Sequence, residues 1–113
     1  MRKAMSEAAV GDDVLGEDPT ITRLEKAAAD IFNMESGLFV ASGTQGNLLA
    51  LFSHCQRGDE YIAGQTAHNY LEEGGGGAIL ASIQPQPVPK EADGTLSLDY
   101  VRELIKPDDF HYA

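Results

Sequence analysis

The stretch Phe39-Val-Ala-Ser-Gly-Thr-Gln-Gly-Asn47 decides the fold class, because an apolar run leads directly into a glycine turn and then into a helical pattern. Residues 37–41 are apolar and bounded by turn residues, which is typical of a short buried strand. The helical pattern has Leu48 and Leu51 on its apolar face and ends at Arg57-Gly58. The stretch therefore predicts the strand–turn–helix unit of an α/β protein.

Outward from this stretch, helical and strand-like patterns alternate. Asp18-Pro19 supplies an N-cap acceptor and a first-turn proline, and an amphipathic helix is expected over about 19–33. Residues 60–64 and 78–83 are apolar runs that we expect to be strands, whereas the prolines of residues 84–89 predict an extended loop.

The last part of the chain predicts one more helix. Ser97 is a candidate N-cap, Leu98 and Val101 begin an apolar face, and Pro107 ends the helix. Residues 110–113 look like the start of a further strand.

This order predicts an α/β fold in which about three strands, joined by crossover helices, form an incomplete sheet. Three strands are few for a parallel sheet that is covered on both faces. Because the last residues also look like the start of an element, we expect residues 1–113 to be a piece of one domain whose C-terminal remainder is absent.

Charge and composition exclude several classes of function. The chain has 18 acidic and 8 basic residues and a net charge of −10, which argues against a nucleic-acid binder and against docking on an anionic membrane. The single cysteine, Cys55, excludes an intrachain disulfide. Because neither a signal peptide nor an apolar run of membrane-spanning length is found, we expect a cytoplasmic protein.

The turn Ser42-Gly43-Thr44 is a candidate anion site. A strand that feeds a helix through such a turn points several backbone N–H groups at one place, where the helix dipole favours negative charge. Gly43 lets the backbone approach a phosphate, and the Thr44 hydroxyl adds a donor. The alternative is a tight turn in which Thr44 only caps the helix. No P-loop or dinucleotide-binding pattern is present at this turn.

His68 and Glu73 follow the second expected strand, so they should lie at the same sheet edge as the glycine turn. A histidine ring can stack on an aromatic cofactor and can transfer protons near neutral pH. The alternative is a solvated loop histidine beside surface acids. The other two histidines and Cys55 have no metal-ligand spacing with His68, so no metal site is expected.

Five sequence blocks, taken in order, resemble one enzyme family. They are Val10–Thr20, Ser42–Asn47, Gly64–Tyr70, Ser82–Pro87 and Ile105–Asp109. Together they resemble the low-specificity L-threonine aldolases, which are pyridoxal-phosphate enzymes of the aspartate-aminotransferase-like fold. The resemblance covers nearly the whole chain and implies that it is a partial large domain of that fold.

The resemblance also implies roles for individual residues. Gly43 and Thr44, with Ser42 in the same turn, resemble the binders of the cofactor phosphate. His68 resembles the histidine that stacks on the pyridine ring near the substrate hydroxyl, and Glu73 resembles a nearby acid implicated in proton handling. The implied reaction cleaves L-threonine or allo-threonine to glycine and acetaldehyde, and the implied assembly is a homo-oligomer, a dimer of dimers.

The chain departs from the family pattern in several respects. Leu15 stands where the family usually has tyrosine, and the family's Ser-Asp-Thr opening is absent. The resemblance implies that the Schiff-base lysine, the aspartate that pairs with the ring nitrogen and the substrate-binding arginines lie beyond Ala113. None of the lysines present has the expected context. We therefore expect the isolated chain to be inactive and to expose apolar surface.

Two other functions stay open. One is a different reaction on the same fold, either β-elimination or transamination. The other is a non-catalytic remnant that binds phosphate or a partner chain. The His-Asn-Tyr sequence at 68–70 and the Gln-Pro-Gln-Pro sequence at 84–87 favour the aldolase.

Overall fold

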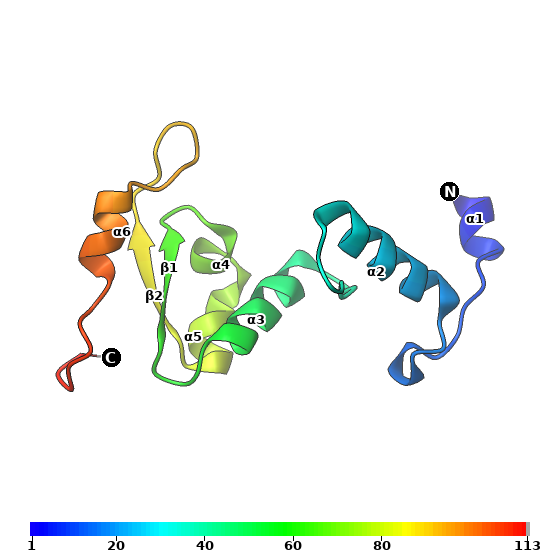
Figure 1. The fold of residues 1–113 in the computed structure, drawn as a ribbon, viewed down its shortest axis with the longest axis horizontal. Helices are drawn as coiled ribbons and strands as arrows, with labels where there is room; N and C mark the ends of the chain where they lie inside the picture. The colour runs from blue at the N-terminus through cyan, green and yellow to red at the C-terminus, as the bar shows by residue number, and fades with distance from the viewer. Residues whose placement is uncertain (113) are drawn as a thin grey trace. The chain divides into compact units, whose positions relative to one another are not determined.

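A computed structural model describes residues 1–112, which form two compact units, one of Met1–Ala41 and one that begins at Ser42 (Figure 1). Helix α1 (Arg2–Ser6), the 3-10 helix η1 (Asp13–Leu15) and helix α2 (Pro19–Phe32) belong to the first unit. The second unit contains two strands and the remaining helices.

Helix α2 confirms the predicted start at Asp18-Pro19. The Asp18 Oδ1 atom accepts the backbone N–H groups of Thr20 and Ile21 at 2.8 and 2.9 Å, and Oδ2 accepts that of Gly11 at 3.1 Å. These backbone hydrogen bonds hold the pKa of Asp18 below its usual value, although burial opposes them. One carboxylate therefore both caps the helix and fixes the acidic loop before it.

The prediction of a strand at residues 37–41 is wrong, because these residues form no strand in the structure. The backbone N–H of Phe39 donates to Glu25 Oε1 at 2.7 Å instead of joining a sheet. Leu38 and Phe39 stay exposed. The apolar run therefore has no sheet face to cover within its own unit.

The second unit is built on two parallel strands, β1 (Glu60–Gly64) and β2 (Gln84–Val88). The register pairs Glu60 with Gln84 and Gly64 with Val88. Helix α3 (Gly43–His54) precedes β1, and the crossover contains α4 (His68–Leu71), η2 (Glu73–Gly75) and α5 (Gly76–Ala81). Figure 1 shows α6 (Leu98–Leu104) and the α3–α5 group on opposite sides of the two strands.

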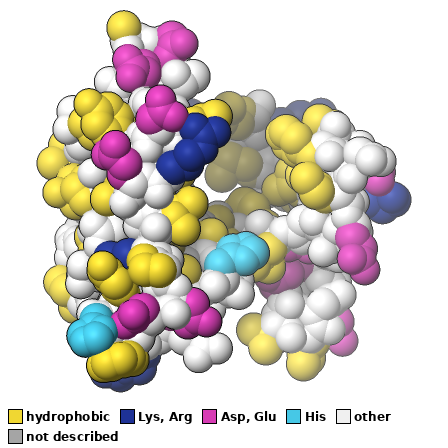
Figure 2. Space-filling view, turned by 60° about the vertical axis from the view of Figure 1, so that its left-hand side comes forward, with side chains coloured by type: hydrophobic (Ala, Val, Ile, Leu, Met, Phe, Trp, Pro, Cys, Tyr) yellow, Lys and Arg dark blue, Asp and Glu magenta, His cyan; other side chains and the backbone are white. Residues whose placement is uncertain are grey.

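The buried core of this unit is small. Ala63 of β1, Ala81 of α5, Ile83 and Val88 are buried, and Ile83 and Val88 are 1% exposed. Many large apolar side chains remain exposed, and Figure 2 shows hydrophobic side chains spread among acidic ones on the visible face. The α/β class and the incomplete sheet are thus confirmed, with two strands in the described residues where about three were expected.

Residues 78–83 are not a strand, contrary to the prediction. Gly74 and Gly75 adopt left-handed backbone angles, with φ of 62° and 66°, and these allow helix α5 to begin directly after η2. Alanine and leucine, which favour helices, follow within α5. The helix ends at Ser82, with φ of 56°.

Residues 84–88 are a strand, although an extended loop was predicted. The Gln84 N–H donates to Asp59 O at 2.9 Å and Val88 O accepts from Gln65 N at 2.8 Å, so the even-numbered residues carry the ladder to β1. Backbone groups of alternate residues point to opposite sides of a strand. Pro85 and Pro87 therefore place their missing N–H groups on the side away from β1.

The C-terminal region agrees with the prediction in part. Ser97 stands at the N-cap of α6, but its side chain makes no capping hydrogen bond. Residues 110–112 form a turn, in which Tyr112 N donates to Asp109 O, and the rest of the strand expected at 110–113 lies outside the described residues. No helix among residues 1–112 is long and apolar enough to cross a membrane.

Candidate functional site

The predicted anion turn lies at the start of helix α3. Ser42 has an extended backbone, with φ of −155°, and its Oγ accepts the Gln45 N–H at 3.1 Å. Ser42 is therefore the residue whose side chain caps the helix, and the Thr44 hydroxyl is not needed for that purpose. The N–H groups of Gly43 and Thr44 lie in the first turn, where a helix supplies no acceptor of its own.

The space beside Gly43 is open. A Cβ atom built on Gly43 meets no heavy atom of the protein within 4 Å. First-turn N–H groups, a hydroxyl and an unobstructed approach form a donor set that suits an anionic group such as a phosphate.

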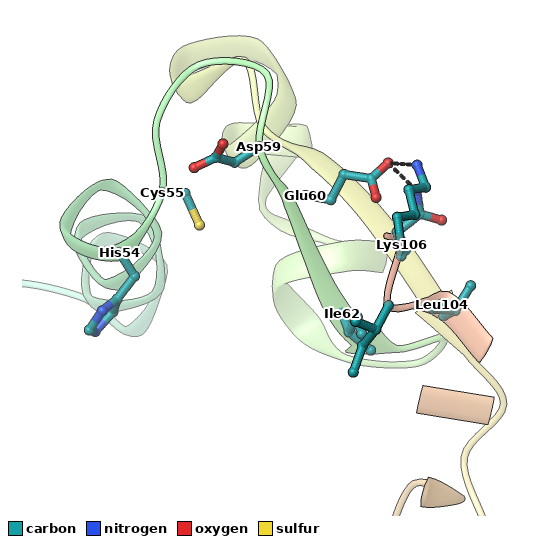
Figure 3. Close-up of a pocket in the computed structure, with 9 residues that line it drawn as sticks. His54, Cys55, Asp59, Glu60, Ile62, Leu104 and Lys106 are labelled. Carbon is teal, nitrogen blue, oxygen red and sulfur yellow. Dashed lines mark hydrogen bonds and ion pairs between the residues drawn. The ribbon is translucent and has the colours of Figure 1, made fainter. Parts of the chain in front are cut away.

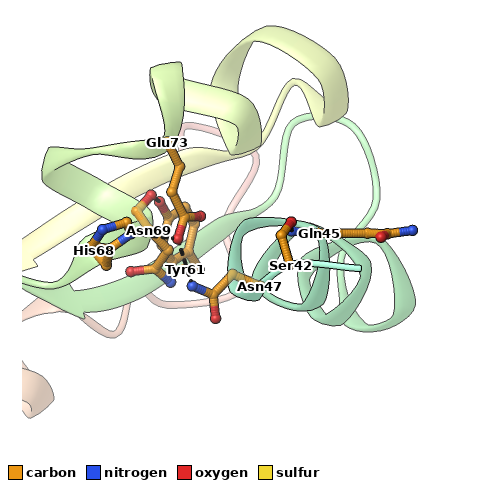
Figure 4. Close-up of polar contacts among 7 residues, drawn as sticks. All are labelled: Ser42, Gln45, Asn47, Tyr61, His68, Asn69 and Glu73. Carbon is orange, nitrogen blue, oxygen red and sulfur yellow. Dashed lines mark hydrogen bonds and ion pairs between the residues drawn. The ribbon is translucent and has the colours of Figure 1, made fainter. Parts of the chain in front are cut away.

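His68 and Glu73, predicted from sequence as a pair, are in contact. The His68 Nδ1 atom lies 2.7 Å from Glu73 Oε1, and the Glu73 side chain is 6% exposed while that of His68 is 69% exposed. Figure 4 shows the two side chains meeting in front of Tyr61. The carboxylate is thus shielded from solvent while the ring remains accessible to a ligand.

A residue of α3 completes this cluster. The Asn47 amide Nδ2 donates to the same Glu73 Oε1 at 2.8 Å, and Figure 4 shows it reaching from the helix that starts at Ser42. Thr44, Asn69 and Glu73 also line one small hollow of about 80 Å³. The structure therefore brings the anion turn and the His68–Glu73 pair together around one helix end.

Two features position the pair: the backbone conformation of Glu73 and a hydrogen bond that holds helix α4, which carries His68. Glu73 itself has φ of 58°, which is uncommon for a residue with a side chain and directs its carboxylate back towards α3 and α4. The Tyr61 hydroxyl donates to Asn69 O at 2.9 Å and so connects β1 to α4. Left-handed backbone at a non-glycine residue is found preferentially at functional sites.

The electrostatics of the cluster favour an ionised Glu73. Hydrogen bonds from His68 and Asn47 hold the pKa of Glu73 below its usual value, against the opposing effect of burial. Burial raises the pKa of Tyr61, with the charges of Glu73 and Tyr70 adding to the effect. A carboxylate at Glu73 can only accept, so His68 Nδ1 must carry a proton in this contact, which leaves Nε2 as the atom available to a ligand.

Sequence reasoning missed Asn47 and Tyr61. Asn47 closes the quoted block Ser42–Asn47, one helical turn after Thr44, and its place on the helix was the signal that could have identified it. Tyr61 had no such signal, because a tyrosine in an apolar strand is ordinarily a core residue.

A second, larger pocket lies elsewhere in this unit. It has a volume of about 360 Å³ and is lined by residues that include His54, Cys55 and Ile62. Figure 3 shows Glu60 and Lys106 at one side of it, joined by an ion pair of 2.5 Å. No group of histidine, cysteine or acidic side chains in residues 1–112 is arranged to hold a metal ion.

The family model described as "Beta-eliminating lyase" matches residues 1–113, the whole chain. The chain belongs to the beta-eliminating lyase family.

Several threonine aldolases are among the relatives of this family member. It is 58% identical over 113 residues to the low specificity L-threonine aldolase of Escherichia coli K12, covering all of this chain and 34% of that protein. It is 44% identical over 107 residues to the probable low-specificity L-threonine aldolase 2 of Arabidopsis thaliana, covering 94% of this chain and 30% of that protein. The chain thus spans about a third of the length of these curated relatives, and the expected resemblance is confirmed.

Proposed function

We propose that this chain is the part of a pyridoxal-phosphate-dependent aldolase that binds the cofactor phosphate and handles a proton, in an enzyme that cleaves L-threonine or allo-threonine to glycine and acetaldehyde. The observation that carries the proposal is the junction of the α3 N-terminus with the Asn47–Glu73–His68 cluster. The identity to threonine aldolases over the whole chain supports the choice of reaction.

In this proposal the first turn of α3 binds the cofactor phosphate. The N–H groups of Gly43 and Thr44 and the Thr44 hydroxyl donate to the phosphate oxygens, while Ser42 keeps the helix end in place. The open space beside Gly43 fits an approaching phosphate, so the residues present suit the group. The exposed His68 ring offers a flat surface on which a pyridine ring can stack.

The second role is proton transfer at His68. Glu73 accepts a hydrogen bond from Nδ1–H of His68 and thereby leaves the Nε2 lone pair to take the proton of the substrate β-hydroxyl. Removal of that proton would allow the Cα–Cβ bond of the substrate to break, with the aldehyde departing and the electron pair of the broken bond remaining at Cα. When bound, the cofactor supplies the electron sink that makes this carbanion accessible.

The remaining parts of the proposal concern the whole enzyme. The Schiff-base lysine comes from a segment other than residues 1–113, the substrate is a small amino acid, and the enzyme is a cytoplasmic homo-oligomer built as a dimer of dimers. Of the lysines in the second unit, Lys106 is engaged by Glu60 in a pocket that shares no residue with the hollow at Glu73. Lys90 forms a β-bridge with Leu96 and is exposed.

A chimera tests the reaction. Residues 1–113 replace the matching segment of the Escherichia coli relative, and the products from L-threonine are identified. We expect glycine and acetaldehyde in equal amounts, and a loss of about 10²-fold or more in rate for His68→Asn, as is usual when a general base is removed. Release of a 2-oxo acid with ammonia would instead indicate β-elimination, and formation of an aminated cofactor would indicate transamination.

The chain by itself tests the non-catalytic alternative. We expect the 113-residue chain to bind pyridoxal phosphate weakly, to release it when inorganic phosphate is added, and to form no borohydride-trappable adduct at any of its lysines. Equal binding of pyridoxal and pyridoxal phosphate would contradict the phosphate role of Gly43 and Thr44.

A further inference from the structure

Asn47 connects the two halves of the proposed site. It lies on α3 one turn beyond Thr44, and its amide reaches Glu73, a residue 26 positions further along the chain, at 2.8 Å. Both Asn47 and His68 donate to the same carboxylate atom, Oε1 of Glu73. The first turn of α3 contains the candidate anion donors, and Asn47 of the same helix is hydrogen-bonded to Glu73, the acid that orients His68.

The chemistry of an amide suits this position. An asparagine NH₂ group donates without gaining or losing a proton, so its hydrogen bond to the carboxylate is available at any pH at which Glu73 is ionised. A hydrogen bond to the charged form of an acid favours that form, and Asn47 is the second-largest cause of the lowered pKa of Glu73. An ionised Glu73 in turn requires a proton on His68 Nδ1.

We propose that Asn47 is a positioning residue, which holds the Glu73 carboxylate against Nδ1 of His68 and so fixes the orientation in which the ring presents Nε2. This role rests on the proposed function, because it assigns Nε2 to the substrate hydroxyl. Asn47 acts on His68 through the Glu73 carboxylate, to which both side chains are hydrogen-bonded.

The backbone at Glu73 explains why a second donor is needed. With φ of 58° and a side chain that is 6% exposed, Glu73 is held in an uncommon conformation with little access to water. A buried carboxylate with a missing partner is destabilised relative to its protonated form. Removal of the Asn47 amide is therefore expected to move Glu73 towards the protonated state.

Two variants of the 113-residue chain test this role. Asn47→Leu removes the donor at similar volume, and Asn47→Asp replaces it with a second carboxylate facing Glu73. The readouts are the Glu73 carboxyl titration by ¹³C NMR and the ring nitrogen shifts of His68 by ¹⁵N NMR. Ser53→Ala is the matched control, because it removes a polar group of α3 that bonds only back to Leu49 O at 2.8 Å.

We expect the Glu73 pKa to shift upward in Asn47→Leu and further upward in Asn47→Asp, with loss of the single Nδ1-protonated tautomer of His68 in both. The Ser53→Ala control should leave both readouts unchanged. If Asn47→Leu loses its helical circular dichroism, Asn47→Asp and the control carry the same comparison. Titration and tautomer that match the unmodified chain in a folded variant would overturn the proposal.

These readouts need no cofactor and no substrate. The positioning role can therefore fail while the chimera still cleaves threonine, and the chimera can fail while Asn47 still controls Glu73. The two results separate the role of Asn47 from the proposed reaction.

Discussion

The hydroxyl of Tyr61 donates a hydrogen bond of 2.9 Å to the backbone carbonyl of Asn69. This bond connects strand β1 to the one-turn helix that carries His68, and the helix is too short to be stable by itself. The position of His68 therefore depends on the strand beneath it.

Tyr61→Phe should lower the free energy of unfolding by about 1 kcal/mol, which is typical for one hydrogen bond between protein groups. Tyr100→Phe is the control, because Tyr100 lies on α6 and is exposed, and a change within about 0.5 kcal/mol is expected there. Urea denaturation measures both. Equal effects of the two substitutions would contradict a specific role for the Tyr61 hydroxyl.

The pH dependence of stability should contain a contribution from Glu73. Because the folded pKa lies below the usual value of 4.5, this contribution is fully present above that value and is lost as the pH falls through the folded pKa. Thermal unfolding of Glu73→Gln and the unmodified chain, compared from neutral to acidic pH, should show a difference that shrinks in that acidic range. The exposed neighbour Glu72→Gln serves as the control, and a pH-independent difference for Glu73→Gln would count against the prediction.

The core of the second unit should depend strongly on one isoleucine. Ile83 is 1% exposed, so Ile83→Ala removes buried methyl groups and is expected to lower the free energy of unfolding by about 2–5 kcal/mol. Ile79 is 73% exposed on α5, and Ile79→Ala should change it by no more than about 0.5 kcal/mol. Chemical denaturation of the pair distinguishes burial from a general loss of apolar side chains.

Gly43 should matter to a ligand and not to the fold. A Cβ at this position meets no protein atom within 4 Å, so Gly43→Ala should leave circular dichroism and unfolding nearly unchanged. Binding of pyridoxal phosphate, followed by absorbance, should weaken because the new methyl group occupies the space that the phosphate needs. Unchanged affinity in the folded variant would argue against a phosphate at this helix end.

The helices that begin with a local signal were predictable from the sequence. Asp18-Pro19 specifies its own helix start, and Ser42 does the same for α3, because a capping side chain acts on neighbouring N–H groups. The strands were predicted less well, since strand formation depends on partners. The apolar run 37–41 lacks a strand assignment, while 84–88 pairs with β1 in spite of two prolines.

The candidate site residues were named one by one from the sequence, whereas their connected arrangement was not. Ser42, Gly43, Thr44 and His68 lie in the sequence blocks, and Glu73 was named from the polar stretch that follows the second expected strand. The structure places His68 and Glu73 in contact. The Asn47–Glu73 contact was not foreseeable, because it joins positions 26 residues apart through a left-handed residue at Glu73. No local pattern in the sequence encodes that turn.

The alternating prolines of β2 restrict the edge at which a further strand can join the sheet of this unit. With Pro85 and Pro87 facing away from β1, the outer rim of β2 offers carbonyl oxygens without the amide hydrogens that an incoming chain would need. This edge of β2 is therefore a poor template for pairing with a strand of another chain. A third strand would instead extend the sheet on the opposite flank, beside β1.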